Sequence, residues 1–432
     1  MPEFLKLISP DKARELILSN IDSPSKRTEL IRTENALGRV SARDILAPHP
    51  LPEFDRSSMD GYAVRARDTF GASEPLPAYL ISVGEVPMGE SPGFNIESGQ
   101  CALIHTGGML PGGADAVVML ENTQIATTDQ NHVIREIEVH RAVSSGENII
   151  RIGEDIVLDQ VILPRGKRLR PADIGGLMAL GILDLHVVQK PRVAILSTGD
   201  EIVPVDQVPQ IGQVRDINSH TLSGVVEKAG GEPVQYGIIP DRQDLLQQTA
   251  GRAIRECDIL VITAGSSASA RDMTADVIAG LGPPGVLVHG INTRPGKPTI
   301  LGSSHGKAIL GLPGNPVSAL VNGYLFLIPV IETLLGILSE PLPSVFAHLS
   351  VNLASQAGRE DWWPVRLMRG SQTISSEGRY PTPESGRGMY LADPIFGKSN
   401  LIFSLAFADG LLKIPENATG LHAGDVVEVF LL

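Results

Sequence analysis

The sequence predicts a multidomain protein that combines an α/β domain with β-rich domains. The chain has 432 residues, which on length alone is more than one domain. From Pro191 to about residue 335, continuous apolar strands alternate with helical segments, as in a doubly wound α/β domain. Residues 76–160, and the chain after residue 340, instead hold short strands separated by glycine- and proline-containing turns.

Composition excludes several classes of function. Hydrophobic residues make up 42% of the chain and charged residues 20%, which is typical of a globular protein. A net charge of −13 and an aromatic content of 4% argue against a nucleic-acid-binding surface. Cys101 and Cys257 form no CxxC motif, so we expect a reducing compartment and no disulfide framework or zinc site. With no signal-like N-terminus, and with the longest apolar run (319–338) interrupted by polar residues, we expect a cytoplasmic protein without a membrane segment.

We expect four domains along the chain. Their bounds are 1–25 with 189–336 for the α/β domain, 26–45 with 160–188 for a small connector, 46–159 for a β-rich domain, and 337–432 for a C-terminal β-barrel-like domain. Helices are predicted at 10–21, from Ser25 to Gly38, and from Pro171 to Leu180. In the C-terminal domain, strands are predicted at 371–374 and 401–406, among others.

In the α/β domain, acidic residues follow three of the predicted strands. Glu201 comes after the strand at 192–196, and Asp241 and Asp272 follow the next two strands of the series. Ligands of such sheets bind at the carboxyl ends of the strands. We therefore expect these acids to share one rim with the loop at 311–316.

A second signal is the stretch from residue 294 to residue 318. It begins with two cations, Arg294 and Lys297, on either side of a Pro-Gly pair, and its second half (311–318) leads into an apolar helical segment. Rigid loops at strand ends, with cations and a helix N-terminus nearby, are typical of an anion site. An anionic ligand of this acidic protein would need such a local cationic site.

The β-rich domain offers three weaker candidates. Asp60 lies in a small polar segment that could equally be an Asp-Gly hairpin turn. Thr106 lies in a glycine-rich loop that could offer N–H groups and a hydroxyl to an anion, or could be an ordinary hairpin loop. Asp155, next to Glu154, could hold a metal or lie in a solvated turn. The residues alone leave these alternatives open.

Taken in order, six motifs resemble those of the molybdopterin molybdenumtransferase family, which includes MoeA and the E domain of gephyrin. The resemblance covers essentially the whole chain. The motifs are FDRSSMDGYAVR (54–65), HTGGMLPGGADAVV (105–118), RIGEDI (151–156), RVAILSTGDE (192–201), RPGKP (294–298) and GLPGNPVSA (311–319).

The resemblance implies an elongated, four-part homodimer whose α/β domain is similar to the enzymes that adenylylate molybdopterin. Its implied reaction takes adenylylated molybdopterin and molybdate, inserts molybdenum at the dithiolene and releases AMP, with a divalent cation such as Mg²⁺. The implied cleft lies between the α/β domain of one subunit and the β-rich domain of the other. The adenylyltransferase and the recipient molybdoenzymes are further implied partners.

The resemblance also implies roles for individual residues. The implied catalytic residues are Asp60, Asp155, Glu201, Asp241 and Asp272, of which the last three also bind the metal. The implied substrate-binding residues are Thr106, Gly265, Ser267, Arg294, Lys297, Pro313 and Pro316. Physical reasoning agrees with these roles, because carboxylates hold hard cations and guanidinium and ammonium groups bind oxyanions. Positioning and charge stabilisation also dominate phosphoryl chemistry.

One segment departs from the family pattern. Where the family has a loop close to T-G-G-V-S-V-G-[DE]-x-D, this chain has Ala264, Ser269 and Ala270 in place of two glycines and an acid. This difference motivates one alternative, a non-catalytic protein that binds molybdopterin or molybdate on the same fold. A second alternative is an interaction scaffold, as in gephyrin. Retention of all five acids favours the enzyme, because a scaffold would not need them.

Overall fold

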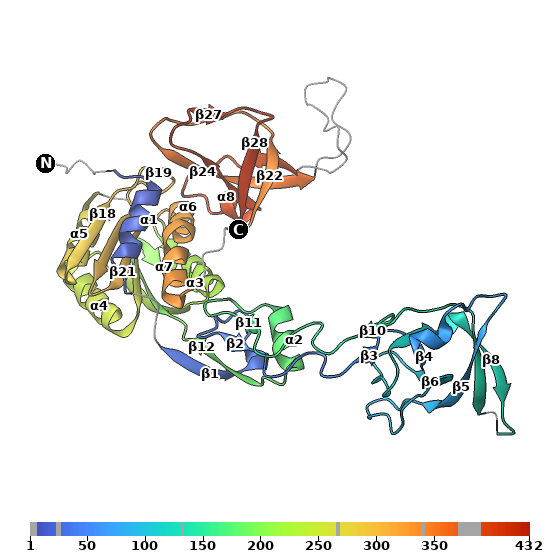
Figure 1. The fold of residues 1–432 in the computed structure, drawn as a ribbon. Helices are drawn as coiled ribbons and strands as arrows, with labels where there is room; N and C mark the ends of the chain where they lie inside the picture. The colour runs from blue at the N-terminus through green and yellow to red at the C-terminus, as the bar shows by residue number, and fades with distance from the viewer. Residues whose placement is uncertain (1–6, 23–26, 132, 265–267, 338–341, 370–389) are drawn as a thin grey trace, which may run out of the picture.

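The computed structural model describes residues 7–22, 27–131, 133–264, 268–337, 342–369 and 390–432 (Figure 1). The subunit is elongated. The α/β unit and a C-terminal barrel lie at one end, a small connector lies in the middle, and a β-rich unit lies at the far end (Figure 1). The predicted multidomain α/β plus β class is therefore confirmed.

The α/β unit is built on a six-stranded sheet with helices on both faces. The sheet order is β16 (Glu232–Ile239), β13 (Arg192–Thr198), β17 (Ile259–Ala264), β21 (Lys307–Pro313), β20 (Ile300–Ser304) and β18 (Pro284–His289). The first four strands are parallel, whereas β20 is antiparallel to both of its neighbours. Val193 and Ile195 join one core cluster while Ala194 and Leu196 join another, so both faces are buried. The helices that alternate with these strands include α3 (Asn218–Ala229), α4 (Gln243–Glu256) and α5 (Ala268–Gly280). The unit also holds a short strand pair, β14 (Ile202–Val203) and β15 (Val214–Arg215).

The apolar helical segment predicted to follow the 311–318 stretch consists of three parts. These are α6 (Pro316–Asn322), a π-helical turn (Gly323–Leu327) and α7 (Ile328–Leu335). Pro329 has no N–H and cannot follow a regular helical turn, which accounts for the widened turn before it. The helix is long and apolar enough to cross a membrane, but 61% of its most apolar window is buried in the molecule. Together with α1 (Pro10–Ser19), it belongs to the main core cluster.

In the connector, the helix predicted from Ser25 to Gly38 is wrong. Residues Thr28–Arg32 form strand β1, which pairs antiparallel with β12 (Asp184–Val188) and is followed by a 3-10 turn (Thr33–Asn35). Exposed and half-buried residues alternate along β1, as expected for a strand that has one face toward a core and the other toward solvent. Pairing with a strand about 150 residues away therefore overrides the local helical pattern. The connector also holds α2 (Pro171–Ala179) and the pair β2 (Ile45–Leu46) and β11 (Val161–Leu163).

The β-rich unit contains a second six-stranded sheet. Its order is β7 (Ala116–Met119), β4 (Gly61–Val64), β6 (Gln100–Ile104), β5 (Ala78–Glu85), β9 (Ile134–Val139) and β8 (Thr123–Thr128). The sequence did not predict β4 or β8. Short 3-10 turns lie at Ala66–Thr69 and Leu120–Asn122, and β3 (Arg56–Ser57) pairs with β10 (Ile149–Ile150) next to the connector.

The C-terminal unit is a closed five-stranded barrel. It consists of β24 (Glu360–Arg369), β25 (Tyr390–Pro394), β22 (Ser344–Leu349), β28 (Val426–Leu431) and β26 (Gly410–Ile414), and the β24–β26 pairing closes it. Strands β23 (Leu353–Ala354) and β27 (Gly420–Leu421) pair separately. The strand predicted at 401–406 is wrong, because helix α8 (Phe403–Ala406) lies there and the Phe403 and Phe407 rings contact each other one turn apart. The strand predicted at 371–374 lies outside the described residues.

Candidate functional site

Parallel pairing brings the acidic residues of the α/β unit to one edge of the sheet. Asp241 follows β16, Glu201 follows β13, and Asp272 lies in α5, the helix that follows β17. Pro313 ends β21, the next strand in the sheet. Gly265 and Ser267, which were predicted to lie between β17 and Asp272, are outside the described residues.

The edge carries closely spaced negative charge. The Asp241 N–H donates to Asp200 Oδ1 at 3.2 Å, and Glu201 folds back over Gly199, where a Cβ would lie 2.7 Å from Glu201 Oε2. Desolvation and the negative charges of Asp200 and Glu201 raise the pKa of Asp241. The described residues contain no ready-made group of three metal-ligating side chains. The oxygen donors at this edge nevertheless fit a hard divalent cation, which would relieve their mutual repulsion.

Replacing Asp241 with Asn is expected to change the pH dependence of stability. The pKa of Asp241 is higher in the folded state than in the unfolded state. Its relative contribution to the free energy of unfolding is therefore fully present below the unfolded-state pKa, where the carboxyl is neutral, and is lost as the pH rises through the folded-state pKa and the carboxyl ionises. Asp241→Asn should therefore gain stability relative to wild type as the pH rises from below the unfolded-state pKa, about 3.9, through the raised folded-state pKa. Chemical denaturation across this range measures the difference. A difference that stays constant with pH would contradict the electrostatic assignment, and millimolar Mg²⁺ should reduce the difference at neutral pH.

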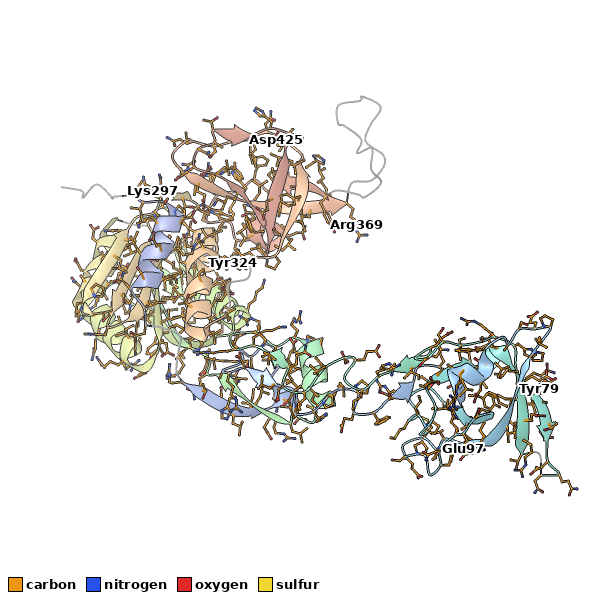
Figure 2. The ribbon with its side chains drawn as sticks, viewed as in Figure 1. Tyr79, Glu97, Lys297, Tyr324, Arg369 and Asp425 are labelled. Carbon is orange, nitrogen blue, oxygen red and sulfur yellow. The ribbon has the colours of Figure 1, made fainter. Side chains whose placement is uncertain are left out.

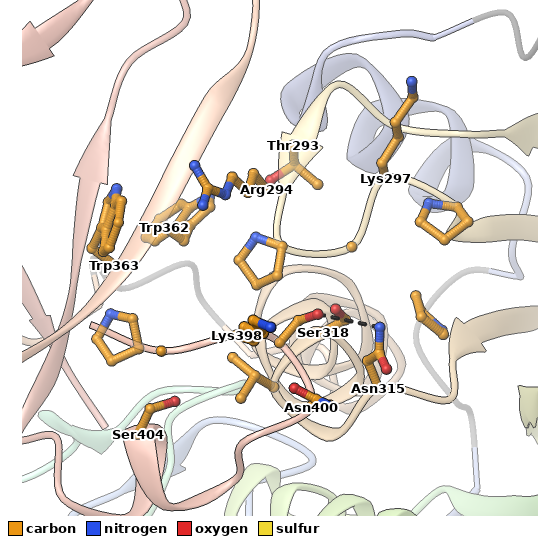
Figure 3. Close-up of a pocket in the computed structure, with 18 of the residues that line it drawn as sticks. Thr293, Arg294, Lys297, Asn315, Ser318, Trp362, Trp363, Lys398, Asn400 and Ser404 are labelled. Carbon is orange, nitrogen blue, oxygen red and sulfur yellow. Dashed lines mark hydrogen bonds between the residues drawn. The ribbon is translucent and has the colours of Figure 1, made fainter. Parts of the chain in front are cut away.

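A cationic cavity of about 640 Å³ lies between the α/β unit and the barrel (Figure 3). It forms because β19 (Thr293–Arg294) leaves the α/β unit and pairs in parallel with β24 of the barrel. The predicted residues Arg294, Lys297 and Pro313 line it, and Pro316 begins α6 beside it. Asn315 and Ser318, from the predicted stretch at 294–318, also line it, and the lining residues of the barrel that the sequence analysis missed include Arg359, Trp362, Trp363, Lys398, Ser399, Asn400 and Ser404.

The charges around this cavity are only partly compensated. Arg359 Nε donates to Asp361 Oδ1 at 2.7 Å, and Arg294 Nη1 lies 3.8 Å from Asp361 Oδ2. Lys297 and Lys398 are exposed, and neither has an ion-pair partner among the described residues. The cavity is therefore net positive in a protein of net charge −13. Cationic and hydroxyl groups gathered in this way can bind a small divalent oxyanion.

Gly296 keeps this cavity compact. Its φ is +107°, and a Cβ at this position would lie 1.7 Å from Nδ2 of the fully buried Asn322. Nδ2 of Asn322 in turn donates to the Ser318 carbonyl at 2.7 Å. The backbone between Arg294 and Lys297 is thus packed directly on the helix that begins at Pro316.

Gly296→Ala is expected to destabilise the protein by about 2 kcal/mol or more, because it combines backbone strain with overpacking. Gly89→Ala is a matched control, since Gly89 has a φ of +78° but no atom within 4 Å of its built Cβ. Gly89→Ala should lower the free energy of unfolding by about 1 kcal/mol, because it introduces backbone strain without overpacking. Thermal and urea unfolding of both variants measure the two values, and equal losses would show that the contact with Asn322 has no energetic role.

Two of the predicted residues of the β-rich unit, Asp60 and Thr106, are in direct contact. The N–H and the hydroxyl of Thr106 donate to Asp60 Oδ1 at 2.7 and 3.0 Å. These two bonds, helped by the charge of His105, lower the pKa of Asp60 and keep it a carboxylate. A simple hairpin at Asp60 is excluded, because β3 pairs with β10 whereas β4 pairs with β6 and β7. Asp155 lies in an exposed turn, and its N–H donates to the Leu51 carbonyl at 3.0 Å.

One chain does not bring these two groups of residues together. Lys297 lies at the end of the molecule where the α/β unit meets the barrel, whereas the β-rich unit, marked by Tyr79 and Glu97, lies at the opposite end (Figure 2). The connector separates the two ends (Figure 1). A site that uses Asp60 together with Glu201 therefore requires a second chain.

Comparison with known proteins gives concordant results along the whole chain. Residues 8–181 match the family model described as MoeA N-terminal region (domain I and II). Residues 194–333 match the "Probable molybdopterin binding domain", and residues 347–432 match the MoeA C-terminal region (domain IV).

Relatives and solved structures agree with these matches. The molybdopterin molybdenumtransferase of Haemophilus influenzae is 32% identical over 96% of this chain and 98% of its own length, and that of Nostoc sp. is 31% identical over 96% and 91%. A crystal structure of a molybdopterin biosynthesis MoeA protein from Pyrococcus horikoshii covers 99% of this chain and 100% of its own, at 32% identity and a TM-score of 0.82.

Proposed function

Since the chain belongs to the MoeA family of molybdopterin molybdenumtransferases and is an enzyme of molybdenum cofactor biosynthesis, we propose that it inserts molybdenum from molybdate into adenylylated molybdopterin and releases AMP. The observation that carries this proposal is the net positive cavity that Arg294, Lys297 and Lys398 line, with Pro313 at the end of strand β21 also in its wall. Molybdate is a small divalent oxyanion, which is the ligand class that such a cavity suits.

Different residues serve the two halves of the reaction. The cavity holds molybdate as substrate, while Pro313 and Pro316 shape the wall between the cavity and the sheet edge. Gly265 and Ser267 are assigned to substrate binding by family resemblance alone. Glu201, Asp241 and Asp272 would hold Mg²⁺ or a similar cation through oxygen ligands. When bound, the cation supplies charge neutralisation for the phosphoanhydride.

The second wall of the site is proposed to come from the partner subunit. A homodimer would place Asp60, Thr106 and Asp155 of one chain opposite the α/β edge of the other, which one elongated chain cannot do alone. The two Thr106 hydrogen bonds keep Asp60 anionic and fixed in direction. In this position the carboxylate can orient the substrate.

The cellular setting follows from the same proposal. The adenylyltransferase that makes the substrate and the molybdoenzymes that receive the product are the expected partners. A cytoplasmic location agrees with Cys101 and Cys257, which are both buried and unpaired.

A reconstituted assay tests the function. Purified protein, adenylylated molybdopterin, Mg²⁺ and molybdate are mixed, and AMP release and molybdenum incorporation are followed together. The proposal expects AMP release that depends on molybdate. Binding of either substrate without such release would instead support the non-catalytic alternative, and binding of neither would support the scaffold.

A further inference from the structure

Arg294 lies along one face of strand β24. The β19–β24 pairing aligns Arg294 with Asp361, and alternate residues of a strand face the same side. Asp361 and Trp363 are such alternate residues, and both contact Arg294. The guanidinium carbon lies 5.4 Å from the centroid of the Trp363 ring, and Nη1 lies 3.8 Å from Asp361 Oδ2.

Both contacts of Arg294 have further partners within the barrel. Asp361 is fully buried and also accepts hydrogen bonds from Arg359 and from Ser355, at 2.7 and 3.0 Å. The Trp363 ring is held edge-on by Phe396 at 5.6 Å, and its backbone pairs with Leu412 inside the barrel.

The arginine itself is not buried. The side chain of Arg294 is 54% exposed and lines the cavity. A long exposed side chain loses conformational freedom when it binds a ligand, unless its surroundings have already ordered it.

We propose that Trp363 is a positioning residue for oxyanion binding. Its indole face and the Asp361 carboxylate hold the Arg294 guanidinium at the cavity before the anion arrives. The Arg294 side chain therefore loses less conformational freedom when the anion binds. This inference rests on the proposed function, because the anion in question is molybdate. It adds a barrel residue whose role is to orient Arg294, with no need to touch the anion.

Substitutions at Trp363 separate this role from simple packing. Trp363→Leu removes the aromatic face and is expected to weaken molybdate binding about three- to tenfold. Trp363→Phe keeps an aromatic face and should stay within about twofold of wild type. The indole N–H has no acceptor among the described residues, so the phenylalanine variant loses no hydrogen bond seen there.

The decisive measurement is a double-mutant cycle, with molybdate affinity measured by calorimetry on the full-length protein. If Trp363 acts through Arg294, Trp363→Leu should have no further effect in an Arg294→Ala background. In turnover, Trp363→Leu should raise the KM for molybdate and leave kcat unchanged. An unchanged affinity, or an equal loss in both backgrounds, would overturn the inference, as would a wild-type protein that does not bind molybdate. If wild type binds molybdate but releases no AMP, the proposed function fails while the cycle still decides the role of Trp363.

Discussion

Asp60→Ala is expected to lower molybdate-dependent AMP release about 100-fold or more, because loss of one preorganised polar group in an active site typically costs this much. The side chain is fixed by two hydrogen bonds from Thr106 and carries a lowered pKa, so it is an ordered carboxylate at neutral pH. Initial rates of AMP release under saturating substrate measure the effect.

The control for Asp60→Ala removes one negative charge at another position in the β-rich unit. Glu74 is exposed in the β-rich unit, outside the Asp60–Thr106 cluster. Glu74→Ala should keep the wild-type rate, and the melting temperature of both variants should stay close to that of wild type. A wild-type rate for Asp60→Ala would remove Asp60 from the site.

Replacing Lys297 and Lys398 together with alanine should weaken molybdate binding about 100-fold, or about tenfold for each charged hydrogen-bond donor lost. These lysines line the cavity from the α/β unit and from the barrel respectively, and neither is neutralised by an acid among the described residues. Calorimetry at low and high salt should show that the wild-type affinity falls more steeply with salt than that of the variant.

A lysine elsewhere on the α/β unit controls for net charge. Lys228 lies in the last turn of α3, and Lys228→Ala should leave molybdate affinity unchanged. If the double variant still bound molybdate like wild type, the cavity would not be the molybdate site, whatever the protein does in turnover.

The architecture was largely predictable because its main signals are local. Continuous apolar strands such as β13 and β17 indicated a doubly buried sheet, and parallel connection then predicted which edge carries Glu201 and Asp241. The helix predicted from Ser25 to Gly38 failed because pairing with a distant strand decides the outcome there. Strand β1 has a helix-like pattern and is a strand only because β12 pairs with it.

The candidate site was predictable on one side only. Arg294 and Lys297 lie in a distinctive motif, whereas Trp363 and Lys398 lie roughly 70 to 100 residues further on and reach the cavity only through the β19–β24 pairing. No local pattern of charge or periodicity marks those barrel residues. Their role depends on a two-residue strand that joins two units, which spacing along the chain does not reveal.

The central claim is a site with walls from two subunits, and it is tested most directly by complementation. Asp60→Ala and Glu201→Gln should each be inactive as pure homodimers. When equal amounts are mixed and allowed to exchange subunits, half of the dimers are mixed, and each mixed dimer has one cleft with both walls intact. We therefore predict recovery of about a quarter of the wild-type AMP release. If the mixture stays as inactive as its parents after mass spectrometry has shown that subunits exchanged, the two-subunit site is contradicted.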